Sequence, residues 1–200
     1  MTAVLRPRFT QAEYLAAERA AERRSEYVNG EILLMTGASY AHSETVGGLL
    51  TALRVRLKGS ACRAVSQDLR TRVDATGLYT YPDVVIVCGE PKFSDAHHDT
   101  LTNPTAIFEV LSPSTESWDR GGKFQHYQRI ASLQEYVLVT QDAPRVERFR
   151  RDGVRWSYER FDGLDALLNL ESPVLQLPLA EIYEGLEFSG VAEPSPPPRS

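Results

Sequence analysis

The chain has 200 residues and a mass of 22.4 kDa, which suffices for one domain with a substantial core and leaves little room for a second. Apolar residues make up 42% of the chain and charged residues 24%, as in ordinary globular proteins. The formal net charge is -5, so the protein as a whole does not attract a polyanion. Binding to nucleic acid would therefore need a local basic patch, a bound metal ion, or both.

The compartment can be inferred from features that a secreted or membrane protein would carry. The N-terminus has no apolar run of the secretory type, and no stretch of about 18 apolar residues could span a membrane. Cys62 and Cys88 lie far apart and outside any CxxC pair, which argues against a disulfide framework or a structural zinc site. Two free thiols indicate a reducing compartment, and we expect a cytoplasmic protein.

The first elements in chain order are a helix, a hairpin and a longer helix, predicted over residues 10–20, 26–35 and 43–57. Thr10 and Glu13 have the spacing of a capping box, which favours a helix start. Asn29-Gly30 predicts the hairpin turn, because both residues tolerate positive φ. The third segment carries apolar residues at helical spacing.

Strands dominate the rest of the chain. We predict strands within 63–73, 83–88, 106–111 and 135–140, a helix over 119–130, a hairpin over 146–161 and an apolar segment at 172–187 that packs on the core. This order predicts an α/β domain around a mixed sheet flanked by helices, spanning residues 10–188. Residues 1–9 are expected to form an N-terminal extension, and 189–200 a disordered Pro-rich tail.

Two carboxylates stand out because of their positions on strands. Asp83 begins an apolar strand directly after Pro82, and Glu109 interrupts another. A buried carboxylate must be protonated, paired with a cation or bound to a metal. On neighbouring strands, two such groups could share a hard divalent cation, with the backbone carbonyl of Val110 as a further ligand. Such an ion can activate water and neutralise a reacting phosphate.

A lysine on the following helix completes this group. Asp119, Lys123 and Tyr127 are spaced four apart and share one helical stripe. If that helix packs over the strand ends, the ammonium of Lys123 can reach a metal-bound water or a phosphate. Lysine suits this role because it is a compact point charge whose pKa shifts readily.

Several motifs in order make the sequence similar to a known family. They are Tyr81-Pro82-Asp83 with its apolar strand, Pro104-Thr-Ala-Ile-Phe-Glu109-Val-Leu-Ser-Pro-Ser, Asp119 with Lys123 and Tyr127, the Glu135 strand, the Glu26-Tyr-Val-Asn-Gly-Glu31 hairpin and His42. This set resembles the Uma2-type (DUF820-like) putative restriction endonuclease family of the PD-(D/E)XK nuclease superfamily, from about Thr10 to Glu187.

The resemblance implies a restriction-endonuclease-like fold, with Asp83 and Glu109 as metal ligands and Lys123 as the catalytic lysine. The sequence departs from the superfamily pattern at Leu111, where the usual motif has lysine. Relocation of that lysine to the next helix is a known variation in the superfamily, and Lys123 is the candidate.

Other polar residues are weaker candidates. Glu44 lies on the first long helix, where superfamily members often place another acidic ligand, but it also reads as a solvent-facing carboxylate near a helix start. His42 could contact a phosphate or act as a base. Gln67 or Asp68 could face the site, since side chains alternate along a strand, and the pattern does not say which.

Simpler interpretations stand beside these. Asp83 could cap a turn, Glu109 could pair with Arg70, Arg72 or Arg129, and Lys123 could be a solvated surface residue. The His97-His98 stretch reads as a polar loop because it lacks zinc-type spacing. The basic run over 145–155 could contact phosphates or serve solubility.

The sequence as a whole favours a Mg²⁺-dependent endonuclease (Mn²⁺ being a possible substitute) that hydrolyses DNA phosphodiester bonds. A homodimer would suit cleavage of both strands. One alternative is a degenerate nuclease fold that binds nucleic acid or a protein without cleavage. The other is an unrelated α/β protein in which Glu109 pairs with a core arginine.

Overall fold

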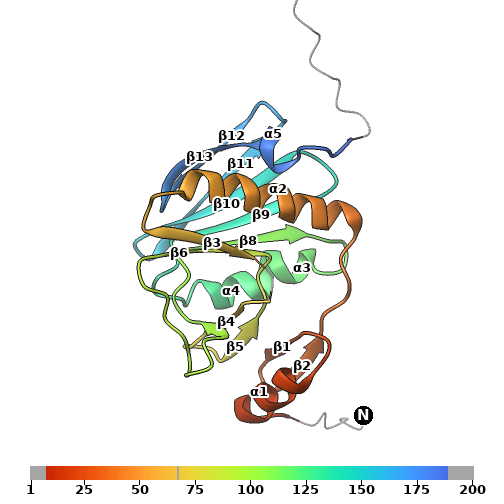
Figure 1. The fold of residues 1–200 in the computed structure, drawn as a ribbon, viewed down its shortest axis with the longest axis vertical. Coiled ribbons are helices and arrows are strands. Elements are labelled where there is room, and N and C mark those ends of the chain that lie inside the picture. Colours follow the sequence, from red (N-terminus) through yellow and green to blue (C-terminus); the bar gives the residue numbers. More distant parts are fainter. Residues whose placement is uncertain (1–7, 67, 189–200) are drawn as a thin grey trace, which may run out of the picture.

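A six-stranded sheet forms the centre of the computed structural model, which describes residues 8–66 and 68–188. Its strands, in the spatial order β11-β10-β9-β8-β6-β3, are β3 (Cys62–Ser66), β6 (Val84–Cys88), β8 (Ala106–Leu111), β9 (Glu135–Thr140), β10 (Arg145–Asp152) and β11 (Arg155–Asp162). The pair β8–β9 is parallel and the other neighbours are antiparallel. This confirms the predicted α/β fold around a mixed sheet (Figure 1).

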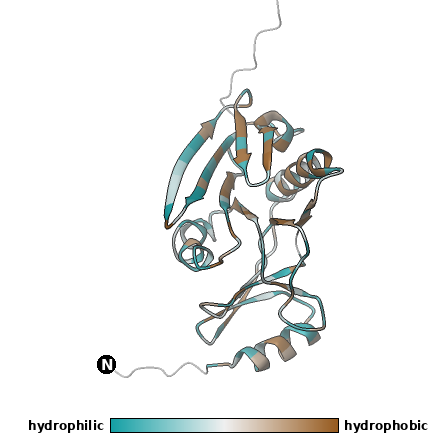
Figure 2. Cartoon of the chain, turned by 90° about the vertical axis from the view of Figure 1, so that its left-hand side faces the viewer, coloured by the Kyte–Doolittle hydropathy of each residue, from teal (hydrophilic) through white to brown (hydrophobic). Residues whose placement is uncertain are grey.

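One face of this sheet is covered by the long helix α2 (Tyr40–Leu57). Alternate residues of each strand point to this face, among them Ile86 and Phe108, and pack with Leu49 and Leu53 of the helix. The ribbon β12 (Leu167–Glu171) and β13 (Val174–Pro178) and the short α5 (Leu179–Ile182) complete this core. The apolar segment 172–187 therefore packs on the core as predicted, and Figure 2 shows hydrophobic residues on α2 and the strands nearby.

The opposite face carries the segment that was predicted as one helix over 119–130. It consists of α3 (Glu116–Trp118), a π-helix η1 (Asp119–Lys123) and α4 (Phe124–Tyr127). The helical segment thus starts three residues earlier than predicted and ends at Tyr127 instead of Ile130, and its middle part is wound as a π-helix. Tyr127 packs here with Ile107, Leu138 and Tyr136 of the sheet.

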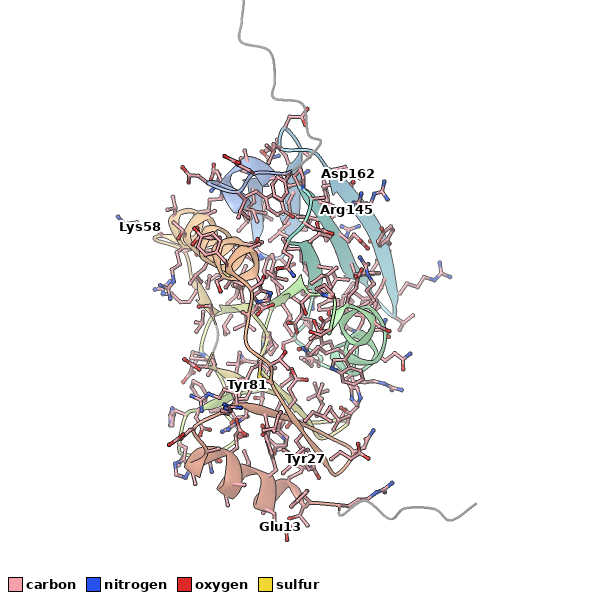
Figure 3. The ribbon with its side chains drawn as sticks, turned by 90° about the vertical axis from the view of Figure 1, so that its right-hand side faces the viewer. Glu13, Tyr27, Lys58, Tyr81, Arg145 and Asp162 are labelled. Atoms are coloured by element: carbon pink, nitrogen blue, oxygen red, sulfur yellow. A yellow bond between two sulfur atoms is a disulfide. The ribbon has the colours of Figure 1, made fainter. Side chains whose placement is uncertain are left out.

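A second, five-stranded sheet lies beside the first and was not foreseen as a separate unit. Its order is β2-β1-β5-β4-β7, with β1 (Ser25–Val28), β2 (Glu31–Leu34), β4 (Arg70–Val73), β5 (Leu78–Thr80) and β7 (Thr100–Leu101). Helix α1 (Gln11–Ala20) packs on it through Tyr14, whose ring lies 5.2 Å from that of Tyr27 and 5.3 Å from that of Tyr79. Tyr27 and Tyr81 are labelled in Figure 3 above this helix.

Local signals explain the N-terminal elements. Thr10 and Glu13 form the predicted reciprocal capping box of α1. Asn29 and Gly30 both adopt positive φ, 51° and 91°, in the turn of the β1–β2 hairpin, as predicted. Helix α2 begins at Tyr40, three residues before the predicted start, because the hydroxyl of Ser39 caps its N-terminus.

The prediction of two free thiols is wrong, because Cys62 and Cys88 form a disulfide. They are 26 positions apart in sequence, but β3 and β6 pair antiparallel in a register that sets Cys62 directly opposite Cys88. Cross-strand register is set by the fold and not by local cysteine spacing, so the sequence carried no signal for this bond.

The predicted domain spans 10–188 and coincides with most of the described chain. The predicted extension 1–9 lies outside the described residues except for Arg8 and Phe9, and the predicted tail 189–200 lies wholly outside them. Within the described ranges no helix is both long enough and apolar enough to cross a membrane.

Candidate active site

Asp83 and Glu109 are brought together by the pairing of β6 with β8. Val84 is opposite Phe108 in this antiparallel pair, so the register continued by one residue places Asp83 beside Glu109. Glu109 points to the face that carries η1 and α4, as Ile107 does. Asp83 directly precedes β6, and its carboxylate reaches His42 of α2 and the amide of Val110, while its charge contributes to the raised pKa of Glu109. The expected juxtaposition of the two carboxylates on neighbouring strands is therefore present.

Asp83 is held by two hydrogen bonds and does not cap a turn. Its Oδ2 accepts the backbone N–H of Val110 at 2.7 Å, and its Oδ1 lies 3.1 Å from Nε2 of His42 at the N-terminal end of α2. The hydrogen bond that His42 donates to the carboxylate of Asp83 is the main reason that the pKa of His42 is raised. Nδ1 of His42 is buried and has no hydrogen-bond partner among the described residues.

Glu109 is buried in the middle of β8, with 3% of its surface exposed. Its Oε1 accepts the hydroxyl of Tyr127 at 2.8 Å and lies 3.2 Å from Nζ of Lys123. Burial raises the pKa of Glu109 well above its usual value, and the nearby ammonium of Lys123 only partly opposes this effect. The buried carboxylate of Glu109 is therefore paired with a cation, as expected for its position, and this cation is Lys123.

Lys123 is buried and faces three carboxylates. Its Nζ lies 3.2 Å from Glu109 Oε1, 3.2 Å from Asp119 Oδ1 and 3.1 Å from Glu26 Oε1. Burial alone would lower the pKa of Lys123, but the charges of Glu109 and Glu26 outweigh it and hold this pKa well above its usual value. Lys123 is therefore a fixed cation in this structure.

Asp119, Lys123 and Tyr127 come together as their spacing predicted, although the winding between them is partly that of a π-helix. Asp119 and Lys123 pair at i,i+4, and both lie in η1. Tyr136 on β9 donates its hydroxyl to the backbone carbonyl of Asp119 at 2.9 Å, which ties η1 to the sheet.

Two further residues of this group, Glu26 and Thr80, belong to the five-stranded sheet and were not predicted as part of the site. Glu26 is 8% exposed and accepts a short hydrogen bond from the hydroxyl of Thr80. Glu26 was noted only as the first residue of a hairpin motif. A signal was present, because a glutamate on an inward-facing hairpin position needs a buried partner.

The remaining candidates are not brought to this group. Glu44, two residues after His42, is exposed on α2 and lines a hollow with Glu181 and Glu184. Asp68 is exposed and pairs with Arg24 at 3.2 Å. Gln67 lies outside the described residues. For Val110, the contact seen is that of its backbone amide with Asp83.

Arginines that could have neutralised Glu109 are engaged elsewhere. Arg70 pairs with Asp99 at 2.8 Å, Arg72 pairs with Asp74 at 3.1 Å, and Arg129 is exposed. The reading of Glu109 as an arginine-paired core residue therefore finds no support in the structure.

The basic run over 145–155 is largely neutralised. Arg145 pairs with Asp162, as the two labelled side chains in Figure 3 show, and Arg148 and Arg150 pair with Glu159 and Glu171. The guanidinium of Arg151 donates to backbone carbonyls and stacks on Trp156. Such a surface offers few free cations to a phosphate backbone.

The donor chemistry of the cluster suits a hard divalent cation. Glu26, Asp83, Glu109 and Asp119 supply carboxylate oxygens, the ligands that Mg²⁺ prefers. Within residues 8–66 and 68–188, however, no three acidic, His or Cys side chains are arranged to hold a metal ion, since the ammonium of Lys123 stands where three of the carboxylates converge. The residues fit the ion by chemistry, and binding would require side-chain rotation.

Comparison with known proteins gives a consistent picture. A model of the Uma2 family, described as "Putative restriction endonuclease", matches residues 11–180. Two uncharacterized proteins of Synechocystis sp. are similar to the chain. The protein sll1609 is 38% identical over 146 residues, which cover 73% of this chain and 82% of that protein. The protein slr1290 is 34% identical over 183 residues, which cover 91% of this chain and 95% of that protein.

A solved structure also resembles the chain. The crystal structure of a putative nuclease belonging to DUF820 from Anabaena variabilis superposes with a TM-score of 0.71, at 22% identity, over 87% of this chain and 97% of that one. This likeness bears on the fold alone, and it confirms the predicted restriction-endonuclease-like architecture.

Proposed function

The chain belongs to the Uma2 family of restriction-endonuclease-like proteins, and from this premise we propose that it is a metal-dependent endonuclease of the PD-(D/E)XK type that hydrolyses phosphodiester bonds in DNA. One observation carries the proposal. Asp83, directly before β6, lies next to Glu109 of the neighbouring strand β8. The buried ammonium of Lys123 contacts Glu109 and so takes the place of the lysine that the usual motif carries two residues further along the strand, where this chain has Leu111.

Asp83 and Glu109 are the residues that would hold Mg²⁺ or Mn²⁺. When bound, the ion would supply activation of a water molecule and neutralisation of charge on the phosphate. The protein prepares Asp83 through the amide of Val110, which fixes one carboxylate oxygen and leaves the other toward His42. Tyr127 fixes Glu109 in the same way, through its hydroxyl.

Lys123 serves in this proposal as a fixed positive charge that stabilises the developing negative charge of the phosphate. Its raised pKa keeps the amine protonated at neutral pH, so it does not take a proton from water in the state described. This favours an electrostatic role over the role of a base.

DNA as substrate and a two-fold dimer as the working form belong to the same proposal. The net charge of -5 and the neutralised arginines disfavour binding through the protein surface alone. Cleavage of both strands of a duplex needs two reaction centres, which two copies of the chain would supply.

A second candidate function is a nuclease fold that binds a partner without cleavage. The enclosure of Lys123 by three carboxylates favours it, since the single positive charge of the ammonium is already paired inside the protein. The two candidates differ in whether a metal ion can enter the cluster.

Calorimetric titration of Mg²⁺ and Mn²⁺ distinguishes them. We expect the wild type to bind the ion and the double variant Asp83→Asn/Glu109→Gln to lose binding, whereas the control Glu90→Gln, at an exposed carboxylate, binds as the wild type does. In a plasmid cleavage assay in the same buffer, we expect the wild type and the control to cleave and the double variant to be inactive. Equal binding in all three proteins, or binding without any cleavage, would contradict the endonuclease proposal and favour the second candidate.

A further inference from the structure

Glu26 reaches the reaction centre from a different sheet than the residues it contacts. It lies on β1 of the five-stranded sheet, whereas Glu109 belongs to β8 of the six-stranded sheet and Asp119 to η1. Its Oε1 lies 3.1 Å from Nζ of Lys123, the shortest of the three carboxylate contacts of that ammonium. The N-terminal hairpin thus supplies a charge to a site otherwise built by the central sheet.

The three contacts are ion pairs with N–O distances of 3.1–3.2 Å, and they set three acidic side chains around one positive charge. Asp119 is four residues from Lys123 on one winding, and Glu109 is on the strand beneath it. These two carboxylates alone leave the lysine side chain free to turn toward the second sheet. Glu26 closes that side, so Nζ is confined near Glu109.

Glu26 is itself held in place. The hydroxyl of Thr80, on the neighbouring part of the same sheet, donates to Glu26 Oε1. Tyr127 joins the two sheets, because its hydroxyl donates to Glu109 and lies 3.5 Å from the hydroxyl oxygen of Thr80. A chain of contacts therefore runs from Glu26 through Thr80 and Tyr127 to Glu109. Each of these four residues is buried, with an exposed fraction of 8% or less.

We propose that Glu26 is a positioning residue of the reaction centre, which holds the ammonium of Lys123 against Glu109 and makes the N-terminal hairpin part of the site. This inference rests on the proposed nuclease function for its kinetic consequence. The placement of Lys123 by Glu26 can be measured whether or not the protein cleaves DNA.

The experiment compares Glu26→Gln and Glu26→Asp with the wild type and with Glu22→Gln, an exposed carboxylate of the same N-terminal region. Glu26→Gln keeps the shape of the side chain and removes its charge. We expect kcat for DNA cleavage in Mg²⁺ to fall on the order of tenfold or more, because a displaced catalytic group costs rate, with KM within about twofold. Glu26→Asp should recover part of kcat, and Glu22→Gln should match the wild type.

A second readout follows the ammonium directly. The chain has three lysines, Lys58, Lys92 and Lys123, and Lys123 is the buried one. In ¹⁵N-lysine NMR spectra we expect one ammonium signal protected from exchange with water in the wild type, lost or shifted in Glu26→Gln and retained in Glu22→Gln. If Glu26→Gln does not fold, Thr80→Val removes the hydroxyl that orients Glu26 and should act in the same direction, more weakly.

The outcomes separate the two proposals. An unchanged Lys123 signal in the Glu26 variants overturns the positioning role whether or not the protein cleaves DNA. An unchanged kcat in a folded Glu26→Gln overturns it as well, and a fall in thermal stability alone would assign Glu26 a structural role. If the wild type does not cleave and the Lys123 signal depends on Glu26, the nuclease proposal fails and the positioning of Lys123 stands.

Discussion

At the scale of single residues, one ammonium group faces three carboxylates in a nearly dry environment. Lys123 and Glu109 are 5% and 3% exposed, so neither charge can be screened by bulk water. Removal of one partner from a buried group of charges leaves the others uncompensated, which costs more than the pair contributed. The stability of the protein should therefore depend on this lysine far more than on its exposed lysines.

Lys123→Met tests that dependence. We expect it to lower the free energy of unfolding by about 3 kcal/mol, because three carboxylates would lose their cation. Urea denaturation at neutral pH measures the loss. The matched control is Lys58→Met, since Lys58 is exposed at the end of α2 and projects away from the protein in Figure 3. Equal midpoints for the two variants would mean that the carboxylates are protonated and need no ammonium.

At the scale of elements, the π-helix η1 decides where Lys123 points. Its sequence contains Gly121-Gly122, and the two glycines have different surroundings. A Cβ built on Gly122 would lie 1.9 Å from the ring of Trp118, whereas one built on Gly121 would have no atom within 4 Å. Gly122 is therefore required for the indole ring to lie across this turn, and Gly121 is not.

Gly122→Ala should force Trp118 or the turn itself to move, at a cost of about 1–3 kcal/mol from overpacking. Gly121→Ala should be neutral or slightly stabilising, because alanine has the higher helix propensity. Thermal unfolding and tryptophan fluorescence measure both effects, although Trp156 also contributes to the emission. A Gly122→Ala protein with the wild-type spectrum and melting temperature would show that the turn accommodates the methyl group.

Elements with strong local signals were predictable from the sequence, and so were the residues whose burial was visible in it. Glu109 is an example, because a carboxylate in the otherwise apolar strand β8 required a cation, whereas Lys123 could equally have been a solvated surface residue. The capping box of α1 and the Asn29-Gly30 turn follow from local chemistry alone. The π-helix did not, since the spacing of Asp119 and Lys123 suits an ordinary helix equally well.

Features that depend on long-range pairing could not be predicted. The Cys62–Cys88 disulfide exists because two strands pair in one register, and a shift by one residue would separate the thiols. The role of Glu26 depends on the contact of a second sheet with η1. Local patterns do not encode which sheet a hairpin joins.

At the scale of the whole molecule, helix α1 is joined to the rest of the protein by ion pairs as well as by the packing of Tyr14 on Tyr27 and Tyr79. Arg19 at the end of α1 donates to Asp99 at 2.9 Å and to Asp95 at 2.6 Å, across about 80 positions of sequence. Arg70 of β4 contacts Asp99 from the other side at 2.8 Å. The acidic residues Asp95 and Asp99, on either side of His97-His98, thus anchor α1 through ion pairs.

The pH dependence of stability should reveal this anchor. The hydrogen bond from Arg19 is the main reason that the pKa of Asp99 is held well below its usual value. A carboxyl group whose pKa is depressed by folding contributes stability above its unfolded pKa, near about 4, and loses it as the pH falls through the folded value. The contribution of Asp99 is therefore complete at neutral pH and disappears only in strong acid.

Asp99→Asn should accordingly lower stability at pH 7 by about 1 kcal/mol, a value kept small because the side chain is about a third exposed and solvent screens the pair. Its difference from the wild type should shrink steadily as the pH is lowered below about 4, and also in high salt, because protonation and screening remove the same charge interaction. Asp152→Asn, in the exposed β10–β11 hairpin, is the control and should follow the wild type at every pH. Urea titrations of the three proteins between neutral and acidic pH measure these differences. A difference that stays constant with pH would show that Asp99 anchors α1 by shape and hydrogen bonding rather than by its charge.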